Sequence, residues 1–319
     1  MAITVRNLTK YYGQERAIND ISFDVKTGEI LGFLGPNAAV KTTTIKIITC
    51  YMPPTAGTVD VDGYSIADHS LEVRRKIGYL PELNPLYPDM NVLEYLDYAA
   101  RLHGIHKTNI KRQMSLMIEV CGLKEMRHKD IGELSKGYRQ RVGLAQAMIH
   151  DPDVLIMDEP TSGLDPNQIV EIRNLIKQLG RAKTVILSTH ILSEVQATCD
   201  RVIIINEGTI VADGTPKQLQ QEFHGSESIT IELKASVADA MMELFPKIKN
   251  LPNVESVEYA GGGDDVHRFS VFSTKGSDIR EELFRQAVAE KWILLEMSRK
   301  VTSLEEVFHK LTKAEEGKQ

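Results

Sequence analysis

Apolar and polar residues alternate along the first 25 positions, and this period of two predicts strands over residues 3–8 and 21–25. The run over residues 30–34 is apolar throughout except for one glycine, as expected for a strand buried on both faces. A helix is predicted from Thr42 to about Cys50. Between residues 83 and 149 the apolar positions recur at helical spacing, which predicts a mainly helical subdomain.

The following segment changes to a regular alternation of strands and helices. The predicted elements are strand 154–157, helix 169–179, strand 184–188, helix 192–197 and a hairpin over residues 202–212. Strands that alternate with helices are typical of a mostly parallel sheet with helices on both faces. The pattern therefore predicts an α/β fold for this part of the chain.

The character of the sequence changes again near residues 223–226. Beyond them the predicted order is βαββαβ, followed by a last helix over 304–311 with a capping box formed by Ser303 and Glu306. This order is that of a small α+β domain of the ferredoxin-like type. We therefore expect two domains, residues 1–224 with a helical subdomain at about 83–149, and residues 225–319.

Composition narrows the class of protein. The chain has 319 residues, of which 42% are hydrophobic and 26% charged, so disordered, collagenous and disulfide-stapled classes are excluded. The formal net charge of −6 argues against a nucleic-acid partner. Three well-separated cysteines, Cys50, Cys121 and Cys199, are expected to be reduced packing residues. No apolar run approaches the ~20 residues of a membrane-spanning helix, so we expect any membrane role to depend on a partner.

The loop between the apolar strand 30–34 and the next helix has the context of a phosphate-binding loop, in which backbone N–H groups at a helix N-terminus hold phosphates. Lys41 is placed to reach the β- and γ-phosphates, and the Thr42 hydroxyl to bind Mg²⁺. The candidate residues are Gly35, Pro36, Asn37, Ala38, Ala39, Val40, Lys41, Thr42 and Thr43.

Val40 departs from the usual pattern G-x-x-x-x-G-K-[ST], because it stands where the second glycine is expected. A β-branched residue resists the backbone angles that glycine adopts there. Two consequences are open: Val40 forces the loop apart, or its methyl groups face the nucleotide.

Further motifs follow in a fixed order. A peptide at 134–141 (Leu-Ser-Lys-Gly-Tyr-Arg-Gln-Arg) precedes a helix, Asp158-Glu159-Pro160 ends an apolar strand, Ser162-Gly163-Leu164-Asp165 follows, and Ser188-Thr189-His190 ends another strand. With these motifs, residues 2–220 resemble the ATP-binding cassette family, the nucleotide-binding subunits of ABC transporters. The resemblance implies a P-loop NTPase cassette with a mixed sheet and a helical subdomain.

The resemblance also implies roles for single residues. Tyr12 stands where the family stacks an aromatic ring on adenine, with Tyr11 as the alternative. Glu82 stands at a position that usually holds a glutamine, where its carboxylate is expected to bind Mg²⁺. Ser135 and Gly137 match the signature that binds the γ-phosphate of ATP on the opposite subunit, although Lys136 and Tyr138 depart from its usual form.

The remaining assignments concern hydrolysis. By the same resemblance Asp158 is expected to hold Mg²⁺, Glu159 to be the general base for the attacking water, and His190 to contact the γ-phosphate. Asp165 is expected to link the two sites of a dimer. The implied cofactors are ATP and Mg²⁺, and the implied partners are a second cassette, identical or different, and an integral membrane permease that contacts residues 83–98.

The local sequence around residues 47–55 and 81–90 is most similar to the gliding-motility-associated branch of ABC-2-type exporters. We therefore expect an ATPase that powers export from the cytoplasmic face of a membrane, to which a permease attaches it. An alternative is a cassette that hydrolyses ATP poorly because Ala38 and Val40 replace glycines. A DNA-repair or translation cassette is disfavoured, because the chain lacks an inserted coiled coil and a second cassette.

Overall fold

The computed structural model describes residues 1–36, 38–222, 228–235, 240–263, 265–274, 277–300 and 304–313. Asn37, the predicted boundary at 223–226 and Ser303 of the predicted capping box lie outside the described residues. Contacts divide the chain into two compact units, Met1–Pro216 with the chain from Leu311 on, and Lys217–Lys310. The domain limits 1–224 and 225–319 stay a prediction.

A six-stranded sheet forms the centre of the first unit, in the order β10-β9-β3-β8-β7-β6. All neighbouring pairs are parallel except β9 and β10, which form the predicted hairpin. Its strands are β3 (Ile30–Leu34), β6 (Ile77–Leu80), β7 (Val154–Asp158), β8 (Thr184–Thr189), β9 (Arg201–Asn206) and β10 (Thr209–Gly214). Because parallel strands end at the same edge, the carboxyl ends of β3, β7 and β8 bring the candidate residues together.

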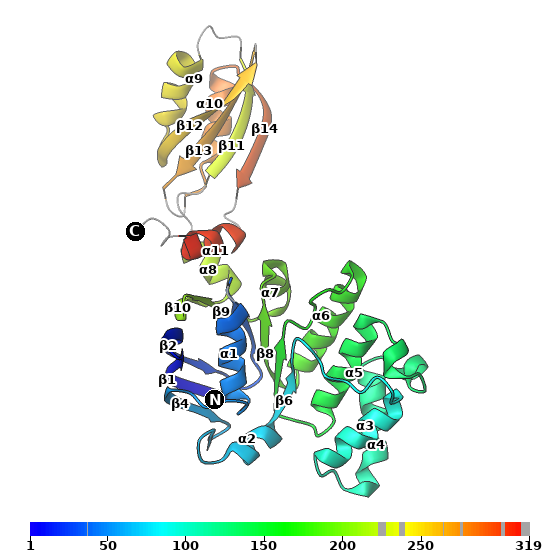
Figure 1. Cartoon of the computed structure of the whole chain (residues 1–319). Coiled ribbons are helices and arrows are strands. Elements are labelled where there is room, and N and C mark those ends of the chain that lie inside the picture. The colour runs from blue at the N-terminus through cyan, green and yellow to red at the C-terminus, as the bar shows by residue number, and fades with distance from the viewer. Residues whose placement is uncertain are drawn as a thin grey trace. The chain divides into compact units, whose positions relative to one another are not determined.

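A second, antiparallel sheet has the order β2-β1-β4-β5, and it consists of β1 (Ile3–Tyr12), β2 (Glu15–Val25), β4 (Ala56–Val61) and β5 (Tyr64–Ser65). Helix α1 (Ala38–Ile48) contacts both β2 and β7 and lies between the two sheets (Figure 1). A shared hydrophobic core joins the sheets, with Phe23 and Phe33 in edge-to-face contact at 5.1 Å between ring centroids.

The other helices of this unit are α2 (Ser70–Lys76), α3 (Val92–Leu102), α4 (Lys107–Val120), α5 (Lys136–Met148), α6 (Pro166–Gly180) and α7 (Leu192–Thr198), with short 3-10 turns at Lys124–Met126 and Ile131–Glu133. Helices α3, α4 and α5 pack together beside the sheet (Figure 1). The predicted helical segment thus begins at Val92 and not at residue 83, because Asn91 caps α3 in a capping box with Glu94. None of the described helices is long and apolar enough to cross a bilayer.

The boundary at Lys217 falls within α8 (Pro216–Glu222), and the second unit continues as β11 (Ser228–Lys234), α9 (Ala240–Lys249), β12 (Val254–Gly263), β13 (Val266–Ser273), α10 (Arg280–Ala289), β14 (Ile293–Lys300) and the first residues of α11 (Leu304–Lys313). Its sheet has the order β12-β13-β11-β14 with antiparallel pairing throughout. This is the predicted ferredoxin-like topology. Alternate residues of the strands, such as Ile231 and Phe269, form its core with Leu244 and Leu283 of the helices.

Two histidines stack where the chain leaves α3 and α5. The rings of His103 and His150 are parallel with centroids 3.9 Å apart, and His150 Nε2 lies 3.2 Å from the Ile77 carbonyl oxygen. Burial, together with the neighbouring His103, lowers the pKa of His150 to about 4. The unfolded chain therefore protonates His150 near about pH 6.5, whereas the folded chain protonates it only at a lower pH.

This difference predicts a loss of stability in acid. The unfolded state binds more protons between about pH 6.5 and 4, so the free energy of unfolding decreases as the pH falls through that interval. We expect a decrease of about 1 kcal/mol from this group between about pH 7.5 and 5.5, measured by urea unfolding. His150→Gln keeps a donor for the Ile77 carbonyl and is expected to remove this contribution to the pH dependence of the free energy of unfolding. An unchanged pH dependence in the variant would count against the assignment.

Candidate active site

The phosphate loop connects β3 to α1. A Cβ atom at Gly35 would lie 2.5 Å from the Ile205 carbonyl oxygen, so the close approach of β9 requires glycine there. The next described turn is helical from Ala38 on, whereas the sequence predicted a helix only from Thr42. This prediction was wrong because Ala38 and Val40, which stand where glycines are expected, allow the helix to begin within the loop.

Val40 is 4% exposed, and its side chain packs into the core between the sheets. Its methyl groups are therefore held by neighbouring apolar residues. The earlier helix start has a consequence for phosphate binding: an α-helix leaves only the N–H groups of its first turn without a partner, so those of Thr42 and Thr43 are bonded inside α1. In this arrangement the N–H groups of Thr42 and Thr43 are not available to a phosphate.

Lys41 is the most deeply buried cation of the site, at 1% exposed. Its Nζ donates to the Gly35 carbonyl oxygen at 2.7 Å and lies 3.5 Å from Glu159 Oε1. A buried ammonium group needs such partners because desolvation is costly. In this arrangement the lysine bridges the end of β3 and the end of β7.

Glu159 lies directly after β7 and is also buried. Its Oε2 is 2.8 Å from His190 Nδ1, and its backbone N–H donates to the Ser188 carbonyl oxygen at 3.0 Å. Its φ of 49° lies in the left-handed region, which a non-glycine residue enters only where the surroundings enforce it. The sequence placed Glu159 and His190 at two strand ends and Lys41 in the phosphate loop, and the structure brings the three into one group of contacts.

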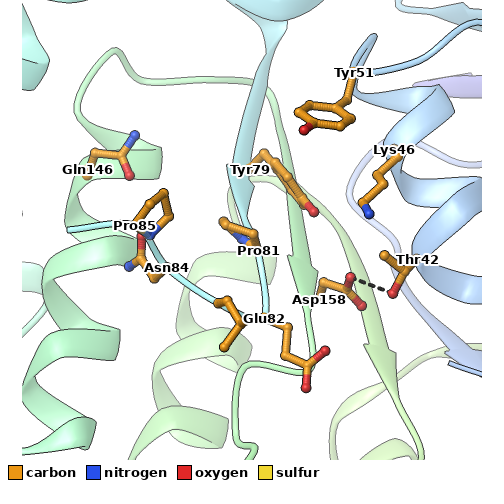
Figure 2. A pocket seen from close by; sticks show the side chains of 11 residues that line it. Thr42, Lys46, Tyr51, Tyr79, Pro81, Glu82, Asn84, Pro85, Gln146 and Asp158 are labelled. Carbon is orange, nitrogen blue, oxygen red and sulfur yellow. Dashed lines mark hydrogen bonds between the residues drawn. The ribbon is translucent and has the colours of Figure 1, made fainter. Parts of the chain in front are cut away.

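Asp158 and Thr42 form a second pair at the same edge of the sheet (Figure 2). Thr42 Oγ1 donates to Asp158 Oδ2 at 2.9 Å, while Asp158 Oδ1 is buried and has no hydrogen-bond partner among the described residues. Glu82 lines the same cavity. Two carboxylates and a hydroxyl are the hard oxygen donors that Mg²⁺ prefers, so the residues present fit that ion.

The cavity has a volume of about 520 Å³ and extends from Thr42 and Asp158 toward α5 (Figure 2). Four of its lining residues, Lys46, Tyr51, Tyr79 and Gln146, are not among the site residues that the sequence predicts. Lys46 could have been found, since it lies one helical turn after Thr42 on α1 and therefore on the same face. Burial and the nearby Asp158 carboxylate raise the pKa of the Tyr79 hydroxyl, which keeps it a neutral hydrogen-bond donor.

Tyr12 lies beside the first turns of α1, with its hydroxyl 3.4 Å from Thr43 Oγ1. Its ring is about half exposed, as the predicted stacking on a base would require. Tyr11, the alternative, contacts the Arg16 guanidinium at 5.4 Å from its ring centroid.

Ser135 and Asp165 each cap a helix. Ser135 Oγ accepts from the Tyr138 N–H at 3.4 Å at the start of α5, and Asp165 Oδ1 accepts from the Gln168 N–H at 2.9 Å at the start of α6. Gly137 joins the two helix ends, since a Cβ there would lie 2.8 Å from Gln168 Cδ. Within the described residues, no hydrogen bond or ion pair connects this group to Lys41, Glu159 or His190.

Comparison with known proteins agrees with this geometry. The family model described as ABC transporter matches residues 18–162, and one described as AAA domain, putative AbiEii toxin, Type IV TA system matches residues 130–195. The chain is 32% identical over 312 residues to the uncharacterized ABC transporter ATP-binding protein YxlF of Bacillus subtilis, covering 98% of this chain and 100% of that protein. The chain belongs to the ABC transporter ATP-binding family.

Other members are similar over the cassette. The Nod factor export ATP-binding protein I of Burkholderia orbicola is 37% identical over 230 residues, covering 72% of this chain and 76% of that protein. A dimeric bacterial ABC transporter cassette, MJ0796, superposes with a TM-score of 0.61 at 26% identity, covering 67% of this chain and 98% of that one. A post-hydrolysis structure of that cassette holds ADP and Pi.

Cassettes of the ABC family are ATPases coupled to transport, so the predicted activity class and the P-loop NTPase fold are confirmed. The cassettes bind ATP and ADP, form dimers and associate with membrane permease subunits.

Proposed function

We propose that this cassette is the ATP-hydrolysing subunit of an ABC-2-type membrane exporter. The observation that carries the proposal is the contact group formed by Lys41 of α1 with Glu159 and His190 at the ends of β7 and β8. An export protein among its relatives supports the direction of transport. The narrower assignment to the gliding-motility-associated branch stays a prediction.

In this proposal the residues have separate tasks. Lys41 moves from its contacts with Gly35 and Glu159 to the β- and γ-phosphates, and Glu159 accepts the proton of the attacking water. His190 holds the Glu159 carboxylate in position and contacts the γ-phosphate. Thr42, Asp158 and Glu82 hold Mg²⁺, which when bound neutralises charge on the phosphates.

The group at the starts of α5 and α6 suits a site shared between two cassettes. Ser135 and Gly137 lie at a helix N-terminus, where free N–H groups and the helix dipole attract a phosphate. Because no hydrogen bond or ion pair among the described residues joins this group to Lys41, we propose that it serves the ATP held by a second cassette. Asp165 at the start of α6 would join the two sites.

Attachment to a permease is tested by capture from membranes. The full chain carries a tag in its source cell, membranes are dissolved in mild detergent, and bound proteins are identified by mass spectrometry. We expect a polytopic membrane protein in stoichiometric amount. In the proposal this protein contacts residues 83–98 of the cassette, which lies on the cytoplasmic side of the membrane. Recovery of the cassette with no membrane protein would contradict the exporter proposal.

A second candidate rests on the start of α1. Because Ala38 and Val40 are helical and Val40 is buried, the N–H groups of Thr42 and Thr43 are bonded within α1 and are not offered to phosphate. Such a cassette would respond to nucleotide or support a permease while hydrolysing ATP poorly. The intact contacts of Glu159 favour the hydrolysing form.

A further inference from the structure

Asn84 occupies a recess on α5 that exists only because residue 143 is glycine. A Cβ atom at Gly143 would lie 1.5 Å from Asn84 Nδ2, 2.6 Å from Asn84 Cγ and 2.9 Å from Leu80 Cδ1. The Asn84 carboxamide therefore takes the space that a side chain at Gly143 would fill. Figure 2 shows this amide against the helix, on the segment that also carries Glu82.

The amide is held there by shape and not by hydrogen bonds. Its Oδ1 and Nδ2 atoms are both buried, and neither has a hydrogen-bond partner among the described residues. An amide buried without partners loses the hydrogen bonds that water would provide, so this position is weakly held. A side chain seated in this way can leave and return without breaking a hydrogen-bond network.

The recess connects two parts of the site. Asn84 lies two residues after Glu82, which lines the cavity with Thr42 and Asp158. Gly143 lies on α5, the helix that Ser135 caps. A displacement of Asn84 from α5 therefore moves the Glu82 carboxylate relative to Asp158.

We propose that Asn84 is a positioning residue: seated in the Gly143 recess, it sets the Glu82 carboxylate against the magnesium site and ties that carboxylate to the helix of Ser135. The magnesium role of Glu82 rests on the proposed function. The seating of Asn84 on α5 does not rest on the proposed function. The seating of Asn84 and the positioning of Glu82 are therefore measured in separate experiments.

The seating is tested with a spin label at Leu83→Cys, whose side chain is 86% exposed in the parent chain. Cys50 is changed to serine, and the buried Cys121 and Cys199 are left in place. We expect the label to move faster after Gly143→Ala than in this background, because the added methyl group expels Asn84. Asn84→Gly empties the recess without a change in α5 and is expected to have the same effect.

Reversal is the sharper comparison. Asn84→Ala in the Gly143→Ala chain makes room for the methyl group and is expected to restore the slower label motion of the background. Gln146→Ala, a change on the same helix and in the same cavity, is the control and is expected to leave the label motion unchanged. On helix propensity alone Gly143→Ala would stabilise α5, so increased label motion cannot come from a weaker helix. Unchanged motion in both Gly143→Ala and Asn84→Gly would overturn the seating.

The positioning of Glu82 is tested by the Mg²⁺ dependence of ATP binding, which needs no hydrolysis. We expect the half-saturating Mg²⁺ concentration to rise about tenfold in Gly143→Ala and in Asn84→Gly, with binding of Mg²⁺-free ATP unchanged. Faster label motion with an unaltered Mg²⁺ dependence would overturn the positioning role. Absence of ATP hydrolysis in every chain, including the parent, would contradict the proposed function but not the seating of Asn84.

Discussion

Restoring both glycines, with Ala38→Gly and Val40→Gly in one chain, is expected to tighten ATP binding by about tenfold to a hundredfold. Glycines disfavour the first turn of α1, so the helix starts later and the N–H groups of Thr42 and Thr43 become available to phosphate. A hydrogen bond to a charged group contributes about 1.5–3 kcal/mol, which corresponds to this range for one recovered donor. Titration with a fluorescent ATP analogue measures the change.

The same variant is expected to be less stable without nucleotide. Val40→Gly removes a buried side chain from the core between the sheets and places glycine in a helix, at a cost of about 2 kcal/mol or more. Thermal melting without ATP should therefore occur at a lower temperature, while ATP raises it by more than in the parent. Ala39→Gly is the matched control, because it loosens the same turn without restoring a motif glycine. Equal affinity in the parent and double variant would show that the loop is not impaired.

Glu159→Gln is expected to lower ATP turnover by a factor of about 10² to 10⁴, the usual contribution of a general base. The amide preserves the shape of the side chain and its contact with His190 but cannot accept the proton of the attacking water. Loss of the carboxylate also removes the ion pair with Lys41, which leaves the lysine free for phosphate. We therefore expect ATP binding to be unchanged or tighter.

Glu125→Gln is the matched control for that substitution, since Glu125 is exposed in a short turn of the helical subdomain. It makes the same chemical change away from the site and is expected to leave turnover unaltered. A Glu159→Gln chain that hydrolyses ATP at the parental rate would remove Glu159 from the reaction.

Much of the fold was predictable because each local pattern agreed with its tertiary setting. The run Ile30–Leu34 is fully buried in the centre of the parallel sheet, as its apolar character indicates. The βαββαβ order specified the antiparallel sheet of the second unit. Strand ends at Asp158 and Thr189 likewise placed Glu159 and His190 near each other, because parallel strands end at one edge.

The parts that could not be predicted depend on contacts between distant residues. The motif at 35–43 suggested a loop up to Thr42, but helix propensity and the burial of Val40 extend α1 to Ala38. The family resemblance predicts a ligand role for Ser135 and a dimer role for Asp165, and only the structure shows that both residues cap helices. The seat of Asn84 over Gly143 joins residues far apart in sequence, and no local pattern indicates it.

Phosphate release from ATP by the unmodified chain, measured beside Glu159→Gln at saturating ATP and Mg²⁺, tests the central claim most directly. That claim is that Lys41, Glu159 and His190 form a working hydrolytic site in spite of Val40. We predict steady phosphate release by the parent chain that falls at least about a hundredfold in Glu159→Gln. Equal background release from both chains, with ATP bound to each, would contradict it.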